Sequence, residues 1–199
     1  LLLAAIVGLI VGSFLTLVTY RLPKNRSVVA ARSACPKCRR KLTIIDLIPL
    51  GSWLIYGGKC RRCKKPIGIR YPLIELACAI GAVVVVKFYG VTFLALALAG
   101  LWWSIVALIV TDLEHYIILD EVQIATAIFG LIYALALDIS LLNVALAAIA
   151  GLALGMALKY GFLWLAKKDG LCMGDVKFLG VAGIWLSQAE SFIPFLFFA

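Results

Sequence analysis

The sequence predicts an all-α polytopic membrane protein with about six transmembrane helices. Hydrophobic residues make up 64% of its 199 residues, whereas soluble domains contain roughly 45–50%, and the mean hydropathy is +1.09. The apolar residues also come in blocks of about twenty, the length that a helix needs to cross roughly 30 Å of hydrocarbon. Basic residues, in contrast, are concentrated in one loop near the N-terminus. These three observations exclude an ordinary soluble globular domain.

The first predicted span is residues 1–20, and a basic loop follows it at 21–71. The span is nearly uncharged and its positive charges come after it, so it is not a cleaved signal peptide. Between Arg21 and Arg70 lie fourteen of the nineteen Lys and Arg residues and one acid, Asp46. The positive-inside rule places this loop in the cytoplasm. Nucleic-acid binding is the rival explanation, but a loop tethered to membrane spans at both ends seldom needs it, so we expect no nucleic-acid partner.

Four of the six cysteines form two Cys-x-x-Cys pairs in this basic loop, separated by twenty-one residues: Cys35, Cys38, Cys60 and Cys63. A reducing cytoplasm does not favour disulfides there. Two such pairs provide the four thiolates that zinc prefers in a closed structural site. The loop is too small and too polar to build a core alone, so metal binding would supply its folding energy, on the order of 10 kcal/mol. The alternative is a set of four unligated cytosolic thiols.

Five further spans are predicted in a membrane-embedded domain at 72–199. We expect them near residues 72–88, 92–110, 117–137, 141–166 and 178–199. Glu75 is expected in the first turn of the second span, where a carboxylate is favourable to the helix dipole. The chain begins without a methionine and ends in an apolar run, so we expect residues beyond both ends in the complete protein.

Two acids, Asp112 and Asp175, stand where the chain leaves or re-enters the bilayer, and ionisable residues in such places are candidates for function. Counting alternate spans from the cytoplasmic loop puts both acids on the cytoplasmic side at the same depth. Two carboxylates a few ångströms apart share one proton. Such a pair can activate water and protonate a carbonyl oxygen, which is acid–base amide hydrolysis. Gly174, with no side chain, and Lys177, with a nearby charge, would support the site.

Other roles for these acids stay open. Asp112 and Asp175 could each cap a helix or lie in a solvated turn, and Asp120 could serve a helix start or line the site. One rival function is that of a non-enzymatic component of a membrane assembly, which would bind its partners through the basic loop that contains the four cysteines. A proton-coupled transporter is another, although the inverted repeats of such proteins are not evident. Serine, metallopeptidase and nucleotide-binding signatures are absent from the sequence.

Four blocks of the chain resemble the type IV prepilin peptidases, bacterial membrane aspartyl proteases of the GxGD class. The resemblance covers most of the chain. The first block is Gly12-Ser13-Phe14-Leu15 with Tyr20-Arg21-Leu22-Pro23. The second is the basic loop at 21–71, called the cysteine-bearing loop below, with Asp46-Leu47-Ile48-Pro49-Leu50 and Ile69-Arg70-Tyr71-Pro72-Leu73-Ile74-Glu75-Leu76. The third is Asp112-Leu113 with Ile118 and Asp120, and the fourth is Gly174-Asp175 with Lys177.

The resemblance implies that Asp112 and Asp175 are the catalytic pair. The enzyme would remove the short basic leader of type IV prepilins or pseudopilins at the cytoplasmic face of the bacterial inner membrane. Members with the cysteine-bearing loop are similar to bifunctional enzymes that then methylate the new N-terminal amine with S-adenosylmethionine. This second activity follows from the resemblance alone.

Two positions depart from the family pattern. Leu119 stands where the family has a proline before the second acid of its first motif, and we expect this to alter the turn but to spare both carboxylates. Cys172 stands where the family has the first glycine of Gly-x-Gly-Asp. Its side chain is expected either to crowd the substrate strand and lower activity, or to reflect an engineered change, while the fold is unaffected.

Overall fold

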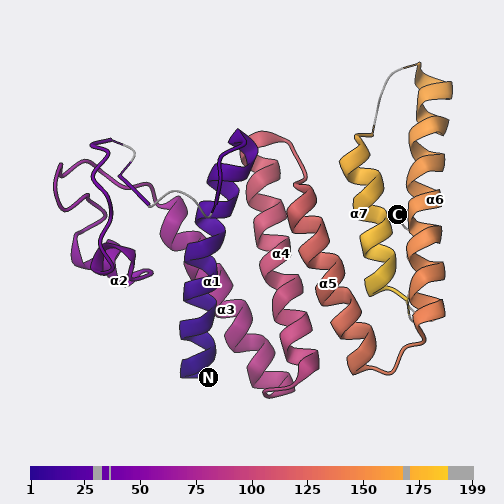
Figure 1. Ribbon diagram of the computed structural model, residues 1–199, viewed down its shortest axis with the longest axis horizontal. Coiled ribbons are helices and arrows are strands. Elements are labelled where there is room, and N and C mark those ends of the chain that lie inside the picture. The colour runs from indigo at the N-terminus through magenta and orange to yellow at the C-terminus, as the bar shows by residue number, and fades with distance from the viewer. Residues whose placement is uncertain (29–32, 36, 168–170, 188–199) are drawn as a thin grey trace. The chain divides into compact units, whose positions relative to one another are not determined.

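The computed structural model describes residues 1–28, 33–35, 37–167 and 171–187 (Figure 1), and the described part is helical apart from loops and two isolated β-bridges. This confirms the predicted all-α class. The α-helices are α1 (Leu2–Arg21), α2 (Gly51–Ile55), α3 (Arg70–Tyr89), α4 (Phe93–His115), α5 (Asp120–Ala136), α6 (Leu141–Ala166) and α7 (Met173–Trp185), with short 3₁₀ turns at Leu22–Lys24 and Ile45–Leu47.

The chain forms two compact units. The first consists of Leu1–Gly90 with Ile105–His115, and the second of Val91–Ser104 with Tyr116–Ala199. The first unit therefore contains α1, the cysteine-bearing loop, α3 and the end of α4. The second contains the beginning of α4 together with α5, α6 and α7.

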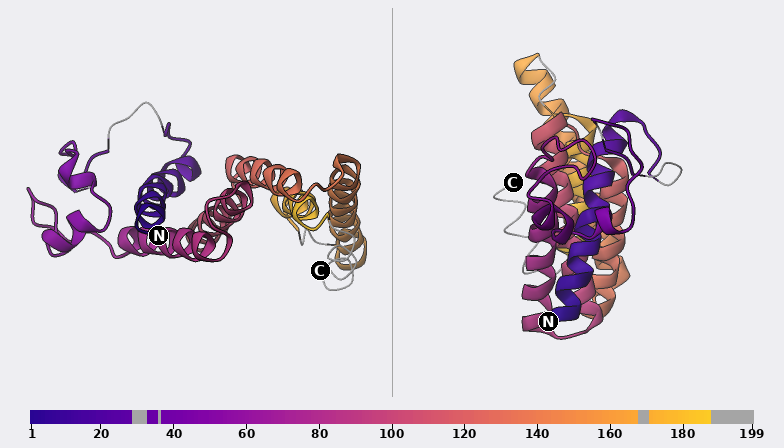
Figure 2. Two further views of the ribbon diagram at one scale, coloured as in Figure 1. Left: turned by 90° about the horizontal axis from the view of Figure 1, so that it is seen from below. Right: turned by 90° about the vertical axis from the view of Figure 1, so that its left-hand side faces the viewer.

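In the first unit, α1 and α3 lie side by side in both views of Figure 2. Two glycines, one helical turn apart on α1, make this close approach possible. A Cβ atom on Gly8 would lie 2.6 Å from Ala79 Cα, and one on Gly12 would lie 2.6 Å from Glu75 Cα. Small residues spaced four apart allow helix backbones to touch where lipid supplies no hydrophobic driving force. The pairing order, with Gly8 near Ala79 and Gly12 near Glu75, makes the two helices antiparallel.

In the second unit, α7 packs against both α6 and α5. Gly155 on α6 faces the backbone of Val176, which is 2% exposed. At its far end, α7 is fixed to α5 by Trp185, whose Nε1 donates a hydrogen bond to the carbonyl oxygen of Thr126 at 3.1 Å and whose ring lies 5.1 Å from that of Tyr133. The first turns of α7 and α5 also lie next to each other, since Gln123 Nε2 donates a hydrogen bond to the carbonyl oxygen of Gly174.

Four helices in the described part of the chain are long and apolar enough to cross a membrane: Leu2–Lys24, Arg70–Tyr89, Phe93–His115 and Leu141–Leu165. They correspond to four of the six predicted spans. The span predicted at 117–137 coincides with α5, a shorter helix of 17 residues. The span predicted at 178–199 begins inside α7, and its residues 188–199 lie outside the described part.

Candidate active site and metal site

The four loop cysteines converge on one point. The Sγ atoms of Cys35, Cys38, Cys60 and Cys63 all lie within 4.8 Å of one another. Four sulfurs around one zinc ion, with Zn–S bonds of about 2.3 Å, would be about 3.8 Å apart. The donor set therefore fits a closed, four-sulfur metal site, as predicted from the spacing.

Each Cys-x-x-Cys pair lies in the same type of tight turn. In the first, Cys35 N donates to Arg40 O at 2.9 Å, and in the second, Cys60 N donates to Lys65 O at 2.9 Å. The residue before each acceptor has a positive φ, 55° at Arg39 and 57° at Lys64. Two repeats of one turn thus present their thiols to a shared centre. The first cysteine of each turn is buried, with 7% of Cys35 and 5% of Cys60 exposed.

Two thiols of the cluster, Cys60 and Cys63, have pKa values shifted in opposite directions. Backbone hydrogen bonds from Cys63 and Arg62 to the sulfur lower the pKa of Cys60 to about 6. For Cys63, the backbone N–H of Lys65 favours the thiolate, but burial and the neighbouring thiols outweigh it and raise its pKa to about 11. Sharing of protons among adjacent groups is typical of a ligand cluster, in which a bound cation would hold all four sulfurs as thiolates.

Asp46 fastens the first turn to the rest of the loop. Its Oδ2 accepts hydrogen bonds from Thr43 N at 3.0 Å and Thr43 Oγ1 at 2.8 Å, and it pairs with Arg40 at 3.0 Å. The Thr43 N–H, the Thr43 hydroxyl and the Arg40 charge hold the pKa of Asp46 below its ordinary value. The one acid of the basic loop is therefore a structural brace.

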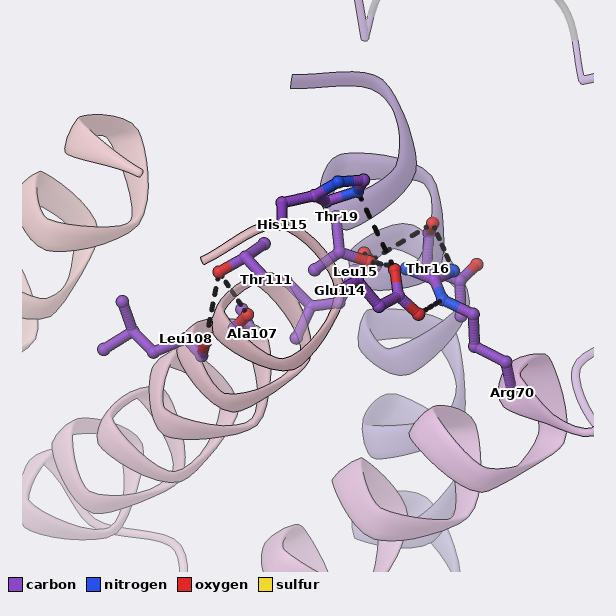
Figure 3. A network of polar contacts seen from close by, with 9 residues as sticks. All are labelled: Leu15, Thr16, Thr19, Arg70, Ala107, Leu108, Thr111, Glu114 and His115. Atoms are coloured by element: carbon purple, nitrogen blue, oxygen red, sulfur yellow. Dashed lines mark hydrogen bonds and ion pairs between the residues drawn. The ribbon is translucent and has the colours of Figure 1, made fainter. Parts of the chain in front are cut away.

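Arg70 joins three helices of the first unit (Figure 3). Its Nε donates to Glu114 Oε1 at the end of α4, and its terminal nitrogens donate to Thr19 Oγ1 at 2.7 Å and Thr16 O at 3.3 Å on α1. His115 lies 3.9 Å from the other Glu114 oxygen. Because Arg70 opens α3, this cluster holds the ends of α1, α3 and α4 together. No local sequence pattern indicates this cluster, since forty-four residues separate the two ionic partners.

Asp112 lies in the last turn of α4, beyond the predicted end of that span at residue 110. It is exposed, and its carboxylate forms no hydrogen bond or ion pair with another residue of the described chain. The C-terminal end of a helix disfavours carboxylates because of its partial negative charge. An N-capping role is therefore excluded, and helix stability does not explain the acid at this position.

Asp175 lies in the first turn of α7 and caps it. Its Oδ2 accepts a hydrogen bond from Cys172 N at 2.9 Å, and the Cys172 sulfur accepts one from the N–H of Asp175 in return. This reciprocal arrangement is a capping box. The capping role weighed for this acid is thus confirmed, and it also fixes the direction of the half-buried carboxylate.

The N-terminal turns of α5 and α7 hold each other through polar contacts. Lys177 Nζ lies 2.9 Å and 2.8 Å from the two oxygens of Asp120, although both side chains are about half exposed. Deeper inside, Gln123 Nε2 donates to the carbonyl oxygen of Gly174 at 3.1 Å, and only 3% of Gln123 is exposed. Sequence reasoning selected Asp120, Gly174 and Lys177 but missed Gln123, which a helical spacing of three from Asp120 would have placed on the same face.

The two departures from the family pattern are compatible with the local backbone. Cys172 has φ −74° and ψ 158°, and Leu119 has φ −75° and ψ 128°. A φ in this range is open to any residue, so the backbone at position 172 does not require glycine. The φ of Leu119 also matches the fixed φ of proline. The expected change of the turn at Leu119 stays a prediction, although its backbone angles are ones that proline can adopt.

Glu75 does not occupy the position predicted for it. The helix α3 begins at Arg70, so Glu75 lies beyond its first turn. The carboxylate instead accepts a hydrogen bond from Leu50 N at 2.7 Å, and 7% of the residue is exposed. Its contact is with the cysteine-bearing loop rather than with the dipole of its own helix.

The structure thus brings together the four cysteines in the first unit, and the first turns of α5 and α7, including Asp175, in the second. Asp112 belongs to the first unit and Asp175 to the second. Their pairing stays a prediction.

Comparison with known proteins covers nearly the whole chain. Residues 6–89 match the bacterial peptidase A24 N-terminal domain, and residues 98–199 match the type IV leader peptidase family. Proteins named prepilin leader peptidase/N-methyltransferase are similar along most of their length. Those of Pseudomonas aeruginosa and Aeromonas hydrophila are each 33% identical over 90% of this chain and 70% of their own, and that of Pseudomonas putida is 30% identical over 92% and 72%. No solved structure matches the chain.

These matches span the cysteine-bearing loop, both motif acids and four membrane-spanning helix candidates in one polypeptide. The chain belongs to the type IV leader peptidase family.

Proposed function

We propose that this protein is a membrane aspartyl endopeptidase that removes the basic leader from type IV prepilins or pseudopilins, with Asp112 and Asp175 as its catalytic pair. The observation that carries the proposal is the family match over residues 98–199, which includes both acids. The local structure supports it, because Asp112 is exposed at a helix end that does not favour a carboxylate. Asp175 is held in a fixed direction by Cys172 N.

In the proposed reaction, the two carboxylates hold one proton between them. The ionised acid takes a proton from a water molecule, and the oxygen of that water attacks the scissile carbonyl carbon. The protonated acid donates its proton to the carbonyl oxygen. Collapse of the tetrahedral intermediate breaks the C–N bond, and the departing nitrogen takes up the proton that the first acid removed from water. Lys177 is engaged with Asp120, so we assign this pair to shaping the site and not to proton transfer.

The domain assignment follows the same reasoning. We assign residues 1–20 to an anchoring span, 21–71 to a zinc-binding region, and 72–199 to the peptidase domain. The protein lies in the bacterial inner membrane, and the excess of basic residues at 21–70 supports a cytoplasmic position for the loop and for the active site. Zinc is the metal we assign to the four thiolates, in a structural role, because four protein ligands leave no position for a catalytic water.

A second activity is part of the proposal. The similar proteins are named as both leader peptidases and N-methyltransferases, and this chain contains the N-terminal region of the family as well as the peptidase region. We assign to it methylation of the new N-terminal amine, with S-adenosylmethionine as the methyl donor.

The test uses purified protein in detergent and a prepilin with a basic leader, with loss of the leader followed by mass. Asp112→Asn and Asp175→Asn are each expected to abolish cleavage while leaving thermal unfolding little changed. Asp138→Asn is the matched control: this acid is exposed with φ 54°, a conformation that asparagine accepts. Cleavage that survives both catalytic changes rules out the aspartyl mechanism. If the wild type binds prepilin without cleaving it, the docking function replaces the peptidase.

A further inference from the structure

The first unit contains a large cavity beside the metal site. Its volume is about 910 Å³, near the upper end of the roughly 300–1,000 Å³ typical of sites for small molecules and cofactors. All its lining residues come from α1, the cysteine-bearing loop and the beginning of α3. Its described lining therefore comes from the N-terminal region and includes neither Asp112 nor Asp175.

The charges around the cavity are unequal. Among the described residues, eight Lys or Arg side chains line it, against two carboxylates, Asp46 and Glu75. Asp46 is occupied by Thr43 and Arg40. A basic leader peptide would be repelled by this lining, so the cavity is unsuited to the peptidase substrate. It suits a small ligand that has an anionic group for the basic side chains and a cationic group for the one deep carboxylate.

The deep carboxylate is Glu75. It is 7% exposed and accepts a hydrogen bond from Leu50 N at 2.7 Å. Leu50 has φ 58° and ψ −46°, a strained conformation for a residue with a side chain, and such strain is concentrated at functional sites. Glu75 thus holds a strained turn at the cavity wall, directly before α2.

Aromatic rings complete the lining, contributed by Tyr20, Trp53, Tyr56 and Tyr71. Trp53 is fixed in place because its Nε1 donates to the carbonyl oxygen of Ile67 at 3.3 Å. Aromatic faces bind flat heterocycles by stacking and attract cations through their π electrons. An adenine ring and a sulfonium are groups of these two kinds.

We propose that this cavity is the binding site for the methyl donor S-adenosylmethionine, with Glu75 facing its positive charge and Trp53 contacting its apolar surface. The inference rests on the methyltransferase half of the proposed function. The ligand has a carboxylate for the basic side chains, an ammonium and a sulfonium for Glu75, and an adenine for the rings. In the transfer, the amine nitrogen forms a bond to the methyl carbon as the carbon–sulfur bond breaks, leaving a thioether, and the nitrogen then loses a proton.

The experiment measures binding directly, by equilibrium dialysis of radiolabelled S-adenosylmethionine against the zinc-loaded protein in detergent. Glu75→Gln retains an acceptor for Leu50 N but removes the charge, and Trp53→Leu removes the ring. Each is expected to weaken donor binding roughly tenfold or more, the loss of a charged hydrogen bond or an aromatic contact. Asp138→Asn and Trp164→Leu are the matched controls, since both residues are exposed and lie in the second unit.

Leader cleavage by the same preparations separates the two proposals. Weakened donor binding with unchanged cleavage supports the cavity assignment. Unchanged binding in both cavity variants overturns it, as does a wild type that binds no donor. Displacement of the donor by ATP at equal concentration also overturns it, because the cavity would then be only a region of positive charge. A wild type that binds the donor but cleaves no leader would contradict the peptidase proposal and leave the cavity assignment standing.

Discussion

Replacement of Gln123 by methionine is expected to lower peptidase activity while leaving the fold as stable as before. Gln123 contacts neither predicted catalytic acid. Its Nε2 holds the carbonyl oxygen of Gly174 at 3.1 Å, directly before Asp175. We therefore regard it as a positioning residue for the turn that contains Asp175. Methionine has a similar length and keeps the packing, but it cannot donate a hydrogen bond to the carbonyl oxygen of Gly174.

The free energy of unfolding changes little because two effects oppose each other. Loss of the hydrogen bond to Gly174 costs about 0.5–1.5 kcal/mol. However, Gln123 Oε1 is buried without a partner among the described residues, and removing such an oxygen gains about 1–3 kcal/mol. The carbonyl of Gly174 still has its ordinary place in the hydrogen-bond pattern of α7. The sum lies between a loss of about 0.5 kcal/mol and a gain of about 2.5 kcal/mol, so no large loss of stability is expected.

The assay compares kcat and KM for leader cleavage with thermal unfolding in detergent. Displacement of a catalytic group by about 1 Å can cost on the order of a hundredfold in rate, so a fall in kcat of roughly tenfold with unchanged KM is expected from partial loosening. Trp185→Phe is the control, since it removes a different α5–α7 hydrogen bond, the one at the far end of α7. It should lower the unfolding temperature and leave kcat unchanged.

Two results would refute this reasoning. Unchanged kcat in Gln123→Met would show that the hydrogen bond does not position Asp175. A parallel loss of activity and unfolding temperature in both variants would show that the α5–α7 contacts act only through stability.

Three further predictions concern other contacts. Arg70→Gln should destabilise the protein by about 1–3 kcal/mol, and a double-mutant cycle with Glu114→Gln should give a coupling energy well above zero; additive effects would contradict the bond between them. Removal of metal by a chelator should expose the cysteine-bearing loop to proteolysis between residues 33 and 67 while α6 stays protected; an unchanged digestion pattern would show that the loop folds without metal. Lys177→Met should alter stability by less than about 1 kcal/mol, because the pair with Asp120 is about half exposed, and unfolding in detergent would detect a larger, contradictory effect.

Acidification should weaken the brace at Asp46. Its pKa is lowered in the folded protein, so the stabilisation is present above the ordinary pKa of the carboxyl and is lost as pH falls through the lower, folded value. Asp46→Asn should remove this acid-dependent part. The measurement is the pH dependence of loop proteolysis below about pH 4, and identical profiles for the two proteins would contradict it.

The paired spacing of the cysteines predicted their cluster because each short turn can aim only at a nearby centre, and two turns of one kind form one site. The acids were harder to interpret. Capping by Asp175 was foreseen as an alternative and is confirmed. The role of Glu114 could not be foreseen, because the contact with Arg70 joins segments that are distant in the chain and depends on how α1, α3 and α4 meet. Glu75 was placed incorrectly because the start of a helix is poorly fixed by local sequence.

The sequence by itself determined the class of this protein, its membrane-spanning character, the four cysteines that cluster as candidate metal ligands, and the two acids of its family motifs. These depend on composition, local spacing and hydrophobic length, all of which are encoded within short segments. Only the tertiary structure revealed the contacts of Arg70, the support that Gln123 gives to Gly174, and the cavity lined by Trp53 and Glu75. Each of these depends on side chains from separate helices or loops that meet through close packing, which no single segment specifies.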